Sequence, residues 1–201
     1  MFTPRRATSA DVGHAIKQQS RLHMDLTLLD PLQGLQVSEL PKRFVRDVSR
    51  SKIGTGRNAF ESGIRAFEKW KQFDLADANH RFLVHDPHPE AVIRIGQIVA
   101  VEVRALGLWS LNLSQIVSVT KTPEVFGFIY KTTPHHAEEG EERFLLTIDP
   151  STNAVHYELE AVSKPHHWLP QVGYPITRSF QHRFARDSHK RVREAVSESP
   201  G

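Results

Sequence analysis

The sequence predicts a single α+β domain in which an antiparallel sheet covers a long C-terminal helix. Between about residues 81 and 163, apolar side chains recur with a period of two in short segments separated by turn signals. Short connections require antiparallel pairing, because parallel neighbours need long crossovers. Helical patterns precede and follow this strand block, so helices are expected to cover one face of the sheet.

Composition narrows the functional classes. The chain has 201 residues, enough for one domain with a full core. It has no cysteine, which excludes a disulfide framework, thiolate metal sites and cysteine nucleophiles. Lys and Arg number 26 against 23 Asp and Glu, a balance too even for a general nucleic-acid-binding surface. No apolar run approaches the roughly 20 residues of a spanning helix, and no secretory signal is recognisable. We therefore expect a cytoplasmic protein without a transmembrane segment.

The first 39 residues are predicted to form an N-terminal extension with one short helix, packed outside the main domain. Asp11 is expected to cap this helix, whose apolar residues lie between Val12 and Ile16. The helix should end before the turn signal at Asp30. From residue 41 to 53 the chain is expected to be extended.

A helix with a buried aromatic face is predicted next. Asn58 followed by Glu61 three residues later is typical of a capping box at a helix start. The apolar positions that then recur at helical spacing are Phe60, Ile64, Phe67 and Trp70.

The strands follow in an unbroken series. Val99, Val101 and Val103 alternate with Glu102 and Arg104, as expected for a strand with one buried face. The predicted strands are Arg81–His85, Gln97–Leu106, Ser114–Lys121, Phe126–Thr132, Glu141–Asp149 and Ala154–Ser163.

A long helix closes the domain. Pro165 and Pro170 are expected to end the sheet, and Pro175 suits a first helical turn. This helix should run to about Val196, which gives a domain of residues 40–197 and a tail of residues 198–201. Its apolar residues at spacing i, i+4 and i+8 are Ile176, Phe180 and Phe184.

Several motifs are shared with a known family. They are Ile53-Gly54-Thr55-Gly56, Gly107-Leu108-Trp109, Phe126-Gly127-Phe128, the segment His136 to Phe144, Ser163-x-Pro165, and Gln181 with Phe184. In these motifs the sequence resembles domain-of-unknown-function family 1990, an uncharacterised bacterial and plant group. That family is similar to START-like (birch-pollen-allergen-like) helix-grip proteins. The resemblance implies a curved antiparallel sheet wrapped on the C-terminal helix, with a cavity between them.

Such a cavity binds small apolar molecules unless large side chains fill it. We therefore expect a hydrophobic small molecule or a lipid as the ligand. Two alternatives stay open: a cyclase- or hydrolase-type enzyme on the same fold, and a ligand-free interaction domain whose aromatic residues fill the cavity. The candidate lining residues are Phe128, Tyr130, Phe144, Tyr157, Phe180 and Phe184.

Polar chemistry is expected at the segment from Pro134 to Arg143, which leads from a turn into a core strand. His136 is the candidate acid–base or hydrogen-bonding group, because imidazole titrates near neutral pH. Glu138 is expected to orient it, and these two would be catalytic in an enzyme. Arg143 is expected to hold either an anionic ligand head or Glu141, which faces away from Glu142 on a strand. Glu142 is a further candidate ligand-binding residue of this segment, and possible neighbours are Trp109 and Asn112.

Other chemistries are weighed and set aside. Gly54-x-Gly56-x-x-Ala59 fits a dinucleotide-binding pattern, but no βαβ alternation follows it. His136-x-Glu138 and His156-x-Glu158 each place two possible metal ligands on one side of a strand, but His156 and Glu158 oppose an apolar face and are expected to face solvent. His166-His167 and His85-x-x-His88 lie in loops with no third partner at matching spacing. The basic residues of the last helix are expected to form a solvated face. The sequence therefore predicts no metal, no cofactor and no nucleic-acid partner, and it indicates no particular oligomeric state.

Overall fold

The structure is a computed structural model of the whole chain. It describes all residues except 1, 26, 37, 39, 78–79, 82–83, 86–92, 106, 166–168 and 199–201. Side chains are described for the same residues except 2, 76–77, 80–81, 84–85, 105, 165 and 169–180.

One large antiparallel sheet dominates the molecule. Its strand order is β4-β12-β11-β10-β9-β8-β7, and β1 (Phe2–Thr3) pairs with β9 beside this path. The strands on the path are β4 (Val45–Thr55), β7 (Val84–His85), β8 (Ile98–Ala105), β9 (Leu108–Lys121), β10 (Val125–Thr132), β11 (Glu138–Ile148) and β12 (Ala154–Pro165). Two small hairpins pair β2 (Leu29–Asp30) with β3 (Gly34–Leu35), and β5 (Ala76–Asp77) with β6 (His80–Arg81).

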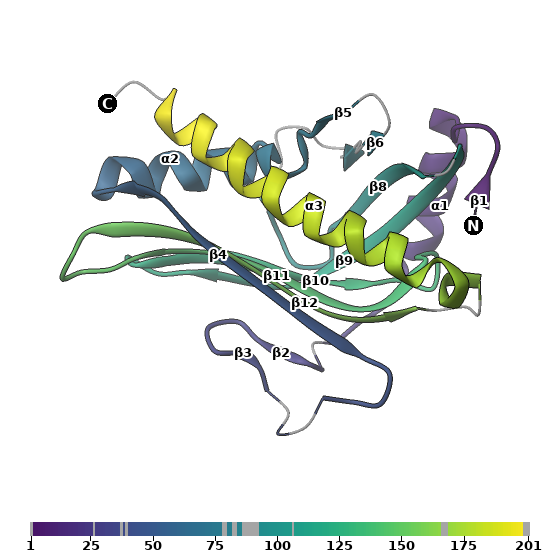
Figure 1. Cartoon of the computed structure of the whole chain (residues 1–201), viewed down its shortest axis with the longest axis horizontal. Coiled ribbons are helices and arrows are strands. Elements are labelled where there is room, and N and C mark those ends of the chain that lie inside the picture. The colour runs from purple at the N-terminus through teal and green to yellow at the C-terminus, as the bar shows by residue number, and fades with distance from the viewer. Residues whose placement is uncertain are drawn as a thin grey trace.

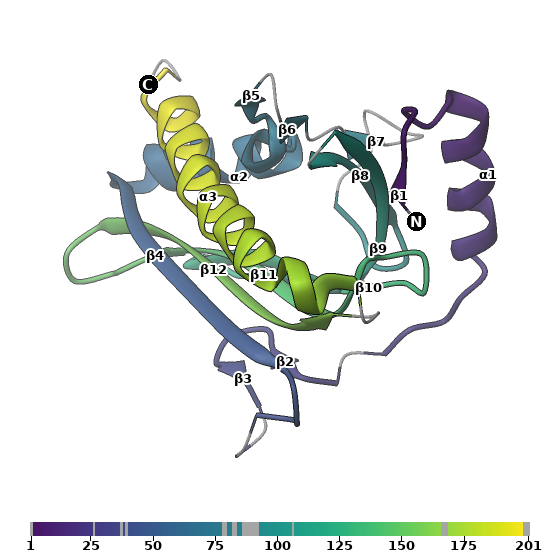
Figure 2. The same cartoon turned by 45° about the vertical axis from the view of Figure 1, so that its right-hand side comes forward.

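The sheet curves around its helices (Figures 1 and 2). The helix α3 (Leu169–Ser197) crosses the concave face, together with α2 (Arg57–Glu68) and the short η1 (Lys71–Phe73). The helix α1 (Ser9–Gln19) and the β2–β3 hairpin lie on the opposite, convex side. This is the α+β helix-grip architecture that the sequence predicts, with antiparallel strands and a C-terminal helix seated on the sheet.

An aromatic core fills the space between α2 and the sheet. Phe67 makes edge contacts with three rings, at centroid distances of 6.2 Å to Phe126, 6.1 Å to Phe128 and 5.1 Å to Tyr157. Phe128 stacks on Phe144 with centroids 4.8 Å apart. Such pairs contribute beyond their buried area. Aromatic side chains therefore fill this part of the interior. The alternative of a ligand-free interaction domain expects such filling throughout the cavity.

The N-terminal segment covers the convex face. Val12 and Ala15 of α1 pack against Ala100 and Leu113 of the sheet. Residues 27–35, which we call the strap, cross strands β10 to β12, and Leu29 is fully buried there against Ile129 and Val162. A second, smaller apolar layer thus lies outside the sheet.

Helix starts differ from the predictions. Thr8, not Asp11, is the N-cap of α1, and Asp11 is the acidic partner of a complete capping box. Gly56, with φ 86°, occupies the N-cap of α2, so Asn58 is not a cap. The last helix begins at Leu169 because Pro170 suits a first turn, where no N–H is needed. The predicted strand at Arg81–His85 falls partly outside the described residues, which include only β6 and β7 there.

Candidate functional site

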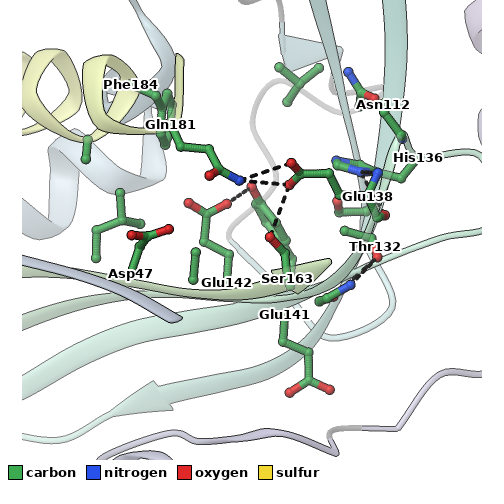
Figure 3. Close-up of a pocket in the computed structure, with 18 of the residues that line it drawn as sticks. Asp47, Asn112, Thr132, His136, Glu138, Glu141, Glu142, Ser163, Gln181 and Phe184 are labelled. Atoms are coloured by element: carbon green, nitrogen blue, oxygen red, sulfur yellow. Dashed lines mark hydrogen bonds between the residues drawn. The ribbon is translucent and has the colours of Figure 1, made fainter. Parts of the chain in front are cut away.

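A cavity of about 300 Å³ lies between the concave face of the sheet and α3, beside the aromatic core (Figure 3). Its lining includes apolar residues, which we call together the apolar wall: Phe73, Val101, Val103, Leu159, Phe184 and Ala185. It also includes polar and charged residues, which we call together the polar end: Asp47, Asn112, Ser114, Thr132, His136, Glu138, Glu142, Ser163 and Gln181.

Carboxylates dominate the polar end. Glu142 accepts a short hydrogen bond from the Tyr130 hydroxyl. Glu138 accepts hydrogen bonds from Gln181 Nε2, at 3.0 and 3.1 Å, and from Ser163 Oγ at 3.2 Å. Gln181 reaches it from α3, so the helix and the sheet both position this group (Figure 3).

The environment of Glu142 favours its protonated form. Desolvation raises the pKa of this carboxyl to about 7, and the negative charges of Glu138 and Asp47 act in the same direction. The hydrogen bond from Tyr130 opposes them. Glu142 therefore changes charge near neutral pH, as groups in functional pockets often do.

His136 is positioned by the backbone. Its Nδ1 lies 2.9 Å from the N–H of Glu138 and 3.1 Å from the carbonyl oxygen of the same residue. The Glu138 carboxylate meanwhile binds Gln181 and Ser163. The two residues expected to act together do line the same cavity, and a backbone contact joins them.

The alternation of β11 distributes its charged side chains between two faces. Glu138 and Glu142 face the cavity, whereas Glu141 points away from it beneath the sheet (Figure 3). Between them, a Cβ at Gly140 would lie 2.2 Å from the carbonyl oxygen of Val162, so only glycine allows this approach of β11 to β12.

Arg143 also lies on the convex side, and two expectations for it are wrong. Its guanidinium is buried 2.5 Å from Glu158 and 2.7 Å from Glu160. It therefore cannot hold the head of a ligand in the cavity. It does not neutralise Glu141 either, because Lys131, at 3.3 Å, is the cation beside that carboxylate.

Only some of the aromatic residues predicted to line the cavity do so. Tyr130 and Phe184 line the cavity. Phe128, Phe144 and Tyr157 belong to the buried core instead. Phe67 of α2 covers Phe128 and Tyr157, and Phe73 of η1 packs against Phe144. The side chain of Phe180 lies outside the described residues.

Trp109 stands apart from the cavity. It lies on the convex side, where the guanidinium carbons of Arg6 and Arg104 are 6.0 and 5.8 Å from the centroid of its ring. Asn112, the other expected neighbour of residues 134–143, does line the cavity, because β9 alternates between faces and residue 112 falls on the side opposite to Trp109.

Sequence reasoning missed Asp47, Ser114 and Gln181 as lining residues. A period-two reading of residues 45–53 would have placed Asp47 on the same face as the buried Ile53. Gln181 lies three residues before Phe184, hence on the same helical face. No local signal marks Ser114.

A serine–histidine pair borders the cavity. Ser49 Oγ lies 2.9 Å from His189 Nε2, and Ser51 Oγ lies 2.9 Å from Nδ1. The imidazole packs on Tyr157 with centroids 4.4 Å apart, and burial lowers its pKa to about 4. Because both ring nitrogens are engaged and the ring is a weak base, the pair ties α3 to β4 and is poorly suited to activate a nucleophile.

Comparison with known proteins assigns the chain to a family. Residues 31–191 match the family described as Domain of unknown function (DUF1990). The protein belongs to the DUF1990 family. It is 30% identical over 213 residues to a UPF0548 protein of Dictyostelium discoideum, covering 98% of this chain and 96% of the relative. A UPF0548 protein of Arabidopsis thaliana is 31% identical, with 81% and 78% covered.

Solved structures share the fold of this DUF1990 protein at low sequence identity. A hypothetical protein of Helicobacter pylori superimposes with a TM-score of 0.54 at 11% identity, covering 84% of this chain and 97% of that one. The di-domain ARO/CYC BexL from the BE-7585A biosynthetic pathway gives 0.53 at 14%, covering 80% and 52%. These likenesses concern the fold alone.

Two further findings concern the described residues. Among them, no helix combines the length and apolar character needed to cross a membrane. No group of three or more His, Asp or Glu side chains within the same part of the chain is placed to hold a metal ion.

Proposed function

We propose that this DUF1990 protein binds a small, largely apolar molecule between the concave face of its sheet and α3. The observation that carries the proposal is the cavity itself. The aromatic core stops at Phe144 and Phe73, and beyond these rings a space of about 300 Å³ is left open. Pockets for small molecules combine an apolar lining with a few convergent polar groups, as this one does.

The size of the cavity favours a compact ligand. A volume of 300 Å³ equals the share of about ten waters in the liquid, at roughly 30 Å³ each. It lies at the lower end of the range for small-molecule pockets, about 300–1,000 Å³. A molecule of one or two rings fits this space better than a lipid with two acyl chains.

Native mass spectrometry of freshly purified protein, followed by extraction and identification of any bound compound, tests the proposal. Ala185, on the apolar wall, allows a blocking variant: Ala185→Phe should fill the cavity and abolish the adduct. Ala195→Phe is its matched control on the same helix, since Ala195 is also partly exposed and lies away from the cavity. It should keep the adduct.

The outcomes separate the alternatives. An adduct that Ala185→Phe alone removes supports a binding protein. A compound that is chemically altered during incubation indicates the enzyme of the same fold. A protein without any adduct, whose stability no small molecule raises, would be an interaction domain and would overturn the proposal.

A further inference from the structure

We propose that the outer edge of β4 binds an extended, acidic segment of a partner protein, which adds to the sheet as a further strand. The inference concerns the edge and the convex side of β4 rather than the cavity, so it does not depend on the proposed function. It follows from the position of β4 in the sheet, its regularity and its charges.

The strand β4 ends the sheet and is paired on one side. Its ladder with β12 runs from Val45 to Thr55, and among the described residues no strand pairs with its other edge. Figures 1 and 2 show β4 as the outermost strand at that end of the sheet. The edge of a sheet presents backbone N–H and C=O groups that can pair with another extended chain.

The edge of β4 contains a long regular stretch. From residue 45 to 52 its pairing with β12 keeps one register, and the irregularity beside Val155 and His156 comes only after this stretch. These residues contain no proline and no bulge, two features that commonly block the addition of a strand. A strand of the usual length, about five or six residues, can therefore pair along this edge.

Basic side chains occupy alternate positions of β4 on its convex face. The burial of the strand alternates, and its exposed positions are Arg46, Val48, Arg50 and Lys52. The side chains of Arg46 and Arg50 are 44% and 53% exposed, and Val48 is an exposed apolar residue between them. Because residues directly opposite each other in a sheet share a face, a partner strand would meet three cations around one apolar side chain.

Carboxylates balance only part of this charge. Arg46 lies 2.7 Å from Glu160, and Arg50 lies 4.0 Å from Glu158. Both glutamates also pair with the buried Arg143. Four cations thus share two carboxylates on this face, and positive charge is left in excess at the edge. The cations are Arg46, Arg50, Lys52 and Arg143.

The same charges oppose pairing of β4 with a second copy of the chain. In an antiparallel pair related by a two-fold axis, a centre at Val48 places Arg46 opposite Arg50. A centre at Ser49 places Arg46 opposite Lys52, and a centre at Arg50 places Arg50 opposite itself. Like charges directly opposite one another destabilise a strand pair. Charge complementarity therefore favours an acidic strand from a different protein.

Four peptides test the charge and the backbone pairing separately. The first is acetyl-Glu-Thr-Glu-Thr-Val-Thr-Glu-Thr-amide, which in an antiparallel pair places its glutamates opposite Lys52, Arg50 and Arg46 and its valine opposite Val48. The second carries lysine in place of glutamate. The other two are the acidic peptide N-methylated at its odd-numbered or at its even-numbered residues. Since antiparallel pairs exchange hydrogen bonds only at alternate residues, one N-methylated form should lose binding and the other should keep it.

Nuclear magnetic resonance titration of the ¹⁵N-labelled protein at low salt gives the affinities and the place of binding. The acidic peptide should shift the amide resonances of residues 45–55 and slow their hydrogen exchange. It should bind about tenfold more tightly than the lysine peptide, the effect of three exposed charge pairs. Its affinity should fall as the salt concentration rises.

Three variants, each shown to be folded by urea unfolding, locate the charges. Arg50→Gln and Lys52→Gln should each weaken binding of the acidic peptide severalfold. Lys121→Gln is the matched control and should leave it unchanged, because Lys121 is an exposed cation of β9, three strands away from β4 in the sheet order β4-β12-β11-β10-β9.

Several outcomes would overturn the inference. They are equal affinity for the acidic and lysine peptides, equal binding of the two N-methylated forms, resonance shifts confined to other strands or to α3, and no binding at all. A dimer in sedimentation experiments that Arg50→Glu strengthens would instead identify a second copy as the occupant of this edge. The native adduct tests the proposed function independently of all these results.

Discussion

The carboxylates of Glu141 and Glu142, consecutive residues of β11, lie on opposite faces of the sheet and in opposite surroundings. Glu141 is buried beneath the strap, where it accepts hydrogen bonds of 2.8–2.9 Å from the backbone N–H groups of Thr27, Leu28 and Leu29 and from the Thr27 hydroxyl. Glu142 faces the cavity among other acids. The carboxylate of Glu141 is surrounded by hydrogen-bond donors, whereas the surroundings of Glu142 favour its protonated form.

Glu141→Gln should destabilise the protein. The substitution replaces an acceptor oxygen by an NH₂ group facing N–H donors, and bonds to a charged acceptor contribute about 1.5–3 kcal/mol each. We expect a loss of at least about 2 kcal/mol in urea unfolding, and faster hydrogen exchange at residues 27–29. Glu139→Gln is the exposed control, with an expected change below roughly 0.5 kcal/mol. Unchanged protection of residues 27–29 would contradict the role of Glu141.

Glu142→Gln should alter the pH dependence of stability. The pKa of Glu142 is raised to about 7 from 4.5, so the folded protein holds its proton over a range where the unfolded chain has lost it. The stabilisation that this proton gives the folded protein is fully present below pH 4.5. It is lost as the pH rises to 7, and the loss is at most about 3 kcal/mol. Relative to the variant, the wild-type protein should lose stability across this window. The free energies of unfolding of both proteins are measured by urea titration between pH 4 and 8. If the two curves run parallel, the pKa of Glu142 is not raised.

His189→Gln should produce the opposite slope. Burial lowers the pKa of His189 to about 4 from 6.5, so the unfolded chain binds a proton first as the pH falls. As the pH falls from 6.5 to 4, the stability of the wild-type protein should decrease by up to about 3 kcal/mol. Below pH 4, His189 should cause no further decrease. Glutamine keeps a donor and an acceptor for Ser49 and Ser51 but does not titrate. The free energies of unfolding of variant and wild type are measured at each pH. Because both proteins contain Glu142, the difference between them reports the titration of His189.

Phe144→Leu and Phe184→Leu should separate the core from the cavity. Phe144 is fully buried and stacked on Phe128, so its replacement should cost roughly 2 kcal/mol and leave the native adduct in place. Phe184 lies on the apolar wall, so its replacement should reduce the amount of bound adduct more than the stability. Urea unfolding and native mass spectrometry on both variants give the comparison, and a reversed pattern would place the cavity elsewhere.

The repeating patterns of the chain predicted its architecture well. Period-two segments such as residues 97–106 became strands, because one-sided burial imposes that alternation. The same alternation correctly separated Glu141 from Glu142. It could not say which partner Arg143 takes, since Glu158 and Glu160 come from the neighbouring strand and only the register of β11 and β12 brings them close.

The site was predicted less well than the fold. An aromatic residue on a concave face either fills the interior or borders a cavity, and its own sequence context is the same in both cases. Phe144 became core because η1 places Phe73 against it, at a centroid distance of 5.5 Å. The polar end likewise assembles Asp47, Ser114 and Gln181 from three distant segments. Only the three-dimensional structure brings them together.

The strap also limits how early the chain can fold during synthesis. Residues 27–35 leave the ribosome early, yet their hydrogen-bonding partners Glu141, Arg143 and Glu160 are more than 100 positions later in the chain. Until β11 and β12 have been translated and paired, the backbone of this segment has nothing to dock on. Such sequence-distant contacts make folding slow and leave nascent strands exposed. The part of the convex face beneath the strap can therefore close only after β11 and β12 have been made.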